Sequence, residues 1–176
     1  AGIGRIPEDR HHEGVVGALS VAENLVLERL DDPEFSRRGI LRRSMIREFA
    51  ARAIAKYDVR GPGPRAPARL MSGGNIQKLI LARVLEAGPR LILANQPTRG
   101  LDVGAAAAVG RALFAARARG AGVVLISEDL DEILSLADRV LVIHAGQVAD
   151  AGPVETVDRV TVGMLMAGRR PAEAAA

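Results

Sequence analysis

Short apolar runs and longer amphipathic stretches alternate along the second half of the chain. Residues 91–94 and 123–126 are continuously apolar, which is typical of strands buried on both faces, and 140–143 predicts a third strand. Helices are predicted between them, over 103–119 and 129–136. Alternation of strands and helices at this spacing implies right-handed crossovers. We therefore expect an α/β fold with a mostly parallel sheet.

The first half of the chain has a mainly helical pattern. Ser20 and Glu23 have the spacing of a capping box, which predicts the start of a helix. A longer helix is predicted over 36–56, with apolar side chains on one face and arginines largely off it. A further helix begins near Gly74 and ends at the Gly-Pro pair 88–89.

Composition narrows the class of protein. The chain has 176 residues, of which 48% are hydrophobic, so it can build one compact domain with a core. It has no cysteine, which excludes disulfide scaffolds and cysteine-based metal sites or nucleophiles. No apolar run approaches the roughly 18 residues that span a bilayer. The chain opens without Met, and we expect it to be a fragment of a longer one.

The residues Ser72-Gly73-Gly74, placed directly before an apolar helix, form a candidate phosphate site. Such a helix start offers a hydroxyl and unpaired backbone N–H groups, with no side chains to prevent close approach. The positive end of the helix dipole points at the same place. For these three residues alone, an N-cap serine with a flexible glycine pair is the simpler explanation.

Several further motifs follow in an order that resembles ABC ATPases. The segment from Ser72 to Lys78 is similar to their signature motif, in the form seen in sugar and nucleoside importers. Residues 91–102 resemble the Walker B strand and D-loop, and 126–129 the switch segment. Upstream, 6–10 and 20–24 resemble the Q-loop region of the second cassette in fused importer ATPases. The resemblance covers nearly the whole chain.

The resemblance implies a P-loop NTPase-like, mostly parallel sheet, present in part, with an inserted helical subdomain. Residues 1–168 are then a single partial nucleotide-binding domain. Within it, about 20–88 form the helical subdomain with the signature, and 89–150 form the RecA-like α/β part. Residues 169–176 are expected to be a tail.

Hydrolytic positions of the family are replaced in this chain. No Gly-x-x-x-x-Gly-Lys-Ser/Thr sequence is present, so the Walker A loop is missing. Asn95 and Gln96 stand where the family has Asp and Glu, Glu128 replaces the switch His, and Glu8 replaces the Q-loop Gln. An amide lacks the negative charge that Mg²⁺ prefers and cannot take a proton from water. We expect no intact catalytic or metal site, and no ATPase activity from this chain alone.

The signature and D-loop are preserved, which suggests a role in a pair of cassettes. In this family each ATP is held between the Walker motifs of one cassette and the signature of another. We therefore expect this chain to contact ATP, with Mg²⁺, that is bound by a second cassette of the same polypeptide or of a dimer. The expected cofactor-binding residues are Ser72, Gly73, Gly74, Asn75, Gln77 and Asp102. Ser72, Gly73, Gly74 and Gln77 would contact the γ-phosphate, and Asp102 would organise the interface.

The implied protein is the ATP-binding subunit of an importer for nucleosides or simple sugars. It would bind transmembrane permease subunits at the cytoplasmic face of the cell membrane, and we favour the nucleoside branch. A structural or regulatory cassette that binds only the permease is the alternative. The Arg-rich segment 37–47 raises a third possibility, nucleic-acid binding. Because no aromatic stacking residues accompany it, we expect a solvated helix face, part of it near the membrane surface, and no nucleic-acid partner.

Overall fold

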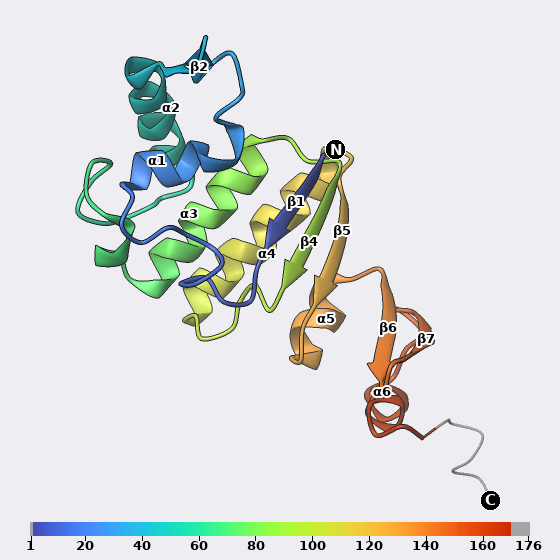
Figure 1. Cartoon of the computed structure of the whole chain (residues 1–176). Helices are drawn as coiled ribbons and strands as arrows, with labels where there is room; N and C mark the ends of the chain where they lie inside the picture. The colour runs from blue at the N-terminus through green and yellow to red at the C-terminus, as the bar shows by residue number, and fades with distance from the viewer. Residues whose placement is uncertain (1, 170–176) are drawn as a thin grey trace, which may run out of the picture. The chain divides into compact units, whose positions relative to one another are not determined.

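Three parallel strands form the sheet of the N-terminal unit. The computed structural model describes residues 2–169, and the chain divides into two compact units, residues 1–126 and 127–176. In the first unit, β1 (Ile3–Ile6), β4 (Leu91–Asn95) and β5 (Gly122–Ile126) stand in the order β1-β4-β5 (Figure 1). Both strand pairs are parallel, which confirms the predicted α/β class.

Helices α3 (Gly73–Glu86) and α4 (Val103–Ala118) cover one face of this sheet (Figure 1). Helix α3 approaches β1 closely because Gly4 has no side chain: a Cβ atom there would lie 2.5 Å from Cγ1 of Val84. The core between helices and sheet includes Ile80 and Ile92, both 0% exposed. This packing fixes the position of α3, whose first residues carry the candidate site.

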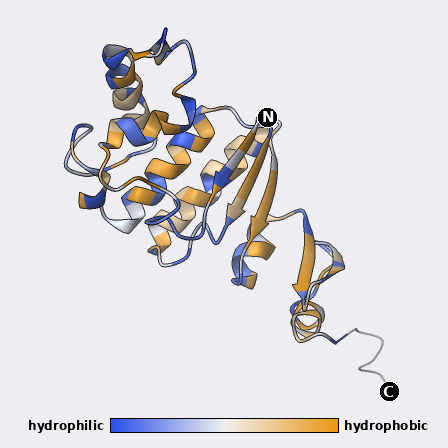
Figure 2. Ribbon diagram, viewed as in Figure 1, coloured by the Kyte–Doolittle hydropathy of each residue, from blue (hydrophilic) through white to orange (hydrophobic). Residues whose placement is uncertain are grey.

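The prediction that these strands are buried on both faces is wrong for the described structure. Figure 2 shows β4 and β5 as apolar strands. Yet Ile92 and Ala94 are buried while Val124 is 47% and Ile126 is 41% exposed. Side chains alternate between the two faces of a strand. Within residues 2–126, the helices cover only one of these faces, so the alternate side chains remain exposed.

The remaining helices of this unit lie before α3. The capping box starts α1 (Val21–Val26) as predicted: the Oγ of Ser20 accepts a hydrogen bond from the Glu23 amide at 3.2 Å, and Oε2 of Glu23 accepts one from the Ser20 amide at 2.8 Å. A 3-10 turn, η1 (Leu27–Arg29), follows α1 directly, and a second, η2 (Ala68–Leu70), lies just before α3.

The helix predicted over 36–56 is wrong in its first part. Helix α2 spans Arg43–Lys56, and it is preceded by a small antiparallel hairpin of β2 (Ser36–Arg37) and β3 (Ile40–Leu41). Arg38 and Gly39 have positive φ angles of 54° and 76°. A right-handed helix cannot contain two left-handed residues, so the helix begins only after this turn.

Over residues 127–169, the second unit consists of a hairpin and two helices. Strands β6 (Arg139–His144) and β7 (Gln147–Pro153) pair antiparallel through a turn at 145–146, where both φ angles are positive, as in a type I′ turn. The third predicted strand thus belongs to a separate sheet and does not extend the parallel one. Helices α5 (Leu130–Leu136) and α6 (Arg159–Met166) contribute side chains to its small apolar core.

Two expectations concern the chain as a whole. Of the tail predicted at 169–176, residues 170–176 lie outside the described residues. Among residues 2–169, the helices are all too short or too polar to cross a bilayer.

Candidate functional site

The start of helix α3 presents free backbone amides. Ser72 is the N-cap residue, and Gly73 and Gly74 are the first two helical residues, whose N–H groups have no acceptor within a helix. The side chain of Ser72 makes no capping hydrogen bond, and the residue is exposed. These groups, together with the helix dipole, can bind an anionic oxygen.

Asn75 holds the serine hydroxyl in place. Its Nδ2 donates to Oγ of Ser72 at 2.9 Å, and its Oδ1 accepts from the backbone amide of Arg60 at 2.7 Å. The contact uses one acceptor position of Oγ and leaves the hydroxyl proton available. Asn75 therefore orients Ser72 and occupies its own polar groups within the chain.

Lys78 contacts Asp58, which lies two residues before the Arg60 amide that Asn75 binds. Its Nζ contacts Oδ2 of Asp58 at 2.8 Å and the Asp58 carbonyl oxygen at 2.9 Å. The hydrogen bond from Lys78, followed by one from Arg60, holds the pKa of Asp58 below its usual range. Asp58 is also in the left-handed region, with a φ of 49°.

Gln77 is buried, unlike its neighbours at the helix start. Only 2% of the residue is exposed, and its Nε2 has no hydrogen-bond partner among the described residues. The structure thus does not bring Gln77 to the surface formed by Ser72, Gly73 and Gly74. A contact from Gln77 to a ligand stays a prediction.

Arg10 joins this surface to the loop after β4, and the sequence did not single it out. Its Nη1 donates to the carbonyl oxygen of Arg99 at 2.7 Å. Its guanidinium lies against the helix start, since a Cβ on Gly73 would be 3.2 Å from both Nε and Nη2, and one on Gly100 would be 3.4 Å from Nη2. An ion pair between Glu8 and Arg99 joins the same two loops.

The loop after β4, residues 96–102, has a tightly defined backbone. The amide of Gln96 donates to the carbonyl of Ile126 at 2.8 Å, and Gln96 adopts a positive φ of 49°. Asp102 then caps α4, because its Oδ1 accepts a hydrogen bond from the Ala105 amide at 2.8 Å. The local role of Asp102 is therefore to start a helix beside the signature.

The residues that the resemblance places at the hydrolytic positions of the family lie on different elements of the chain. Asn95 is the last residue of β4 and Gln96 follows it. Both are half-buried, so the C-terminal end of this strand carries side-chain amides. Glu8 is paired with Arg99. Glu128 is exposed and lies in the second unit. Across residues 2–169, no three His, Asp or Glu side chains gather as metal ligands would.

The parallel sheet and the helices packed on it match the fold of an ABC ATPase cassette. A solved ATP-binding cassette, described as a dimeric post-hydrolysis state bound to ADP and Pi, superposes with a TM-score of 0.67 at 22% identity. The match covers 84% of this chain and 62% of that one. No family model matches the chain.

Sequence relatives give a narrower placement. The chain is 43% identical over 166 residues to a nucleoside import ATP-binding protein of Lactococcus lactis subsp. cremoris, covering 94% of this chain and 33% of that protein. It is 42% identical over 175 residues to a guanosine import ATP-binding protein of Bacillus subtilis, covering 99% and 34%. A glucose import ATP-binding protein of Haloferax volcanii is also 42% identical, over 99% of this chain and 32% of that protein.

The chain is thus a homologue of sugar and nucleoside import ATP-binding proteins, and it has the fold of an ABC ATPase cassette. It spans about one third of the length of the curated relatives that it matches.

Proposed function

We propose that this chain is part of the ATP-binding subunit of an importer for nucleosides or simple sugars, and that its signature completes the ATP site of a partner cassette. The observation that carries the proposal is a contrast within one unit. The start of α3 keeps an exposed serine and two free glycine amides, whereas the end of β4 carries Asn95 and Gln96 where hydrolysis needs carboxylates.

The chemistry at the start of α3 and the chemistry at the end of β4 support different roles. Free N–H groups and a hydroxyl at a helix start stabilise negative charge on a phosphate without any proton transfer. Bound ATP with Mg²⁺ supplies the phosphoryl group and the divalent charge. The amides of Asn95 and Gln96 neither hold a divalent cation well nor accept a proton from water. The residues of this chain therefore bind and orient, and hydrolysis belongs to the partner cassette.

Individual residues have distinct parts in this proposal. Ser72, Gly73 and Gly74 meet the γ-phosphate, and Asn75 orients the serine hydroxyl through its 2.9 Å contact. Asp102 shapes the interface by fixing the start of α4. Gln77 is a proposed ligand that must first leave its buried position.

The wider assignments follow from the same homology. We propose that residues 20–88 form the helical subdomain and 89–150 the RecA-like part of one partial domain over 1–168. A second cassette and permease subunits are the proposed partners, and the cytoplasmic face of the membrane is the proposed location. The names of the nucleoside and guanosine relatives favour the nucleoside branch.

The test is a Ser72→Arg substitution in the full-length protein assembled with its permease. Because Ser72 is exposed and makes no capping bond, arginine fits in the isolated chain, but it would fill the space of a bound phosphate. We expect loss of most ATPase activity. Ser44→Arg is the matched control, since Ser44 is an exposed residue in the first turn of α2. If Ser72→Arg and the control both retain full activity, the chain is a structural cassette that only binds the permease.

A further inference from the structure

The hairpin before α2 gathers positive charge on an exposed turn. Between residues 37 and 47 the sequence contains five arginines and no acidic residue. We call residues 36–43 the arginine hairpin. Its arginines, at positions 37, 38, 42 and 43, are all exposed. The segment is thus a cationic surface, and the loop that precedes it contains acidic residues.

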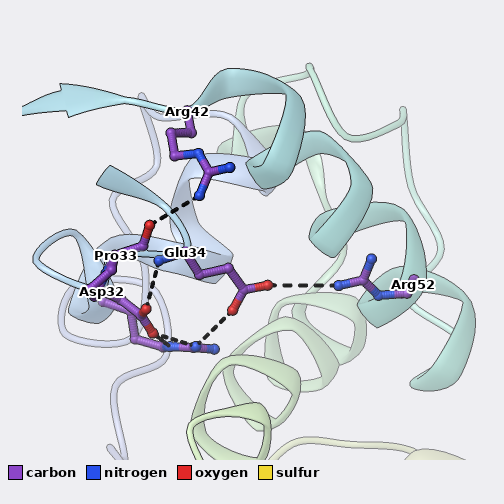
Figure 3. Close-up of polar contacts among 6 residues, drawn as sticks. Asp32, Pro33, Glu34, Arg42 and Arg52 are labelled. Carbon is purple, nitrogen blue, oxygen red and sulfur yellow. Dashed lines mark hydrogen bonds and ion pairs between the residues drawn. The ribbon is translucent and has the colours of Figure 1, made fainter. Parts of the chain in front are cut away.

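Asp32 and Glu34, two of the three acidic residues of that loop, are already paired (Figure 3), and Asp31 is the third. Arg29 contacts Oδ2 of Asp32 at 2.6 Å and Oε2 of Glu34 at 3.3 Å, and Arg52 lies 3.9 Å from Oε1 of Glu34. The Arg29 guanidinium is also held over the ring of Phe35, 4.7 Å from its centroid. Arg29 and Arg52 therefore balance the charge of Asp32 and Glu34, and neither carboxylate forms an ion pair with an arginine of the hairpin.

The hairpin arginines lack such compensation. Arg42 donates to the carbonyl oxygen of Pro33 at 3.2 Å, a contact that leaves its charge in place (Figure 3). Arg43 acts on Glu23 only at a distance, by lowering its pKa after the larger effect of Ser20. Arg37 and Arg38 make no ion pair with any described residue. The net positive charge of the turn is available to an external anion.

Two aliphatic residues share this exposed turn. Ile40 is 73% exposed and Leu41 is 42% exposed. Scattered apolar residues are normal on surfaces, but here two neighbours stand on a short hairpin among arginines. Apolar and cationic side chains together match a surface that offers both anionic groups and hydrocarbon.

The turn also stores backbone strain. Arg38 has a φ of 54°, in a position where Gly, Asn or Asp is preferred because a larger residue is strained there. An arginine at this place keeps its guanidinium at the tip despite the unfavourable backbone.

We propose that the arginine hairpin docks on the surface of an anionic lipid bilayer. The guanidinium groups bind lipid phosphates, for which their planar fork is well suited, and Ile40 and Leu41 enter the interfacial region. A nucleic acid would use the arginines but not the aliphatic pair, and no aromatic residue of the hairpin is present to stack on bases. The surface is separate from the signature and needs neither ATP nor a partner cassette.

The test is co-sedimentation of the full chain with vesicles. Binding is compared between vesicles of phosphatidylglycerol mixed with phosphatidylcholine and vesicles of phosphatidylcholine alone. Each arginine near an anionic surface contributes about 1 kcal/mol, so Arg37→Gln with Arg38→Gln should weaken binding to the anionic vesicles about thirty-fold. The matched control, Arg65→Gln with Arg111→Gln, removes the same charge from exposed positions elsewhere.

Further variants separate the possible outcomes. Ile40→Ser should weaken binding to anionic vesicles by several-fold, and added salt should weaken it for the wild type. Circular dichroism of each variant confirms that the fold is retained. Equal loss in the control pair, equal binding to neutral vesicles, or no binding to either would overturn the proposal. Binding to a short duplex RNA that depends on the arginines but not on Ile40 would identify a polyanion site instead.

Discussion

The contact between Arg10 and Gly73 is testable by a double-mutant cycle. Arg10→Ala removes a charged hydrogen bond of 2.7 Å to the Arg99 carbonyl. Hydrogen bonds to charged groups contribute about 1.5–3 kcal/mol, and the lower end applies because Arg10 is only half-buried. We expect the free energy of unfolding to fall by about 1.5 kcal/mol.

Gly73→Ala should destabilise only when Arg10 is present. The new Cβ would lie 3.2 Å from Nε and Nη2, so the guanidinium must shift by some tenths of an ångström and lengthen its bond to Arg99. When Arg10 is alanine this obstacle is gone, and replacing glycine should stabilise the chain by about 0.4–1 kcal/mol through the unfolded state. The interaction energy of the pair should therefore be about 1 kcal/mol.

Urea denaturation of the wild type, both single variants and the double variant gives this interaction energy directly. Gly74→Ala is the matched control, because its Cβ would meet Ala105 and Leu101 only at 4.0 Å. That variant should show no interaction with Arg10→Ala. Additive effects for Gly73→Ala and Arg10→Ala would refute the conclusion that Arg10 packs against the signature.

Two further predictions concern polar contacts of the N-terminal unit. Asn24 is 0% exposed, and its side chain bonds the amide of Val16 at 2.8 Å and the carbonyls of Val16 and Ser20 at 3.0 Å. Asn24→Ala should lower the free energy of unfolding by about 2–4 kcal/mol in urea titrations, because these part-buried backbone groups lose their partners and a buried side chain is removed. Asp58 has a lowered pKa, so the stability that it adds with Lys78 is present above the ordinary value of 3.8 and lost as pH falls through the lowered pKa. The difference in stability between wild type and Asp58→Asn should therefore be constant near neutral pH and shrink below about pH 4; a difference that does not change with pH would contradict the assignment.

Features set by neighbouring residues were predicted correctly from the sequence. The capping box at Ser20 and Glu23 and the start of α3 after Ser72 depend on side chains within a few positions of one another. The buried face of α2, with Ile46 and Phe49, follows from helical spacing. Before Ile46 no apolar residue falls on this face. The hydrophobic spacing therefore gives no support for a helix over 36–42.

Features set by distant residues could not be predicted. The hydrogen bond from Arg10 to Arg99 joins residues 89 positions apart, and nothing local marks either of them as a partner. The inward position of Gln77 likewise depends on packing that motif spacing does not describe. The apolar composition of β5 indicated two buried faces, whereas the described helices cover only one.

Helix α3 combines an exposed tip with a buried body. Its first residues carry the amides of the candidate site, and the stretch from Leu79 to Leu85 is buried throughout. A side chain held in a close-packed core cannot slide without opening a cavity. The tip therefore cannot be displaced on its own, as a loop could. We therefore expect a displacement of the signature to move α3 together with the sheet on which it packs.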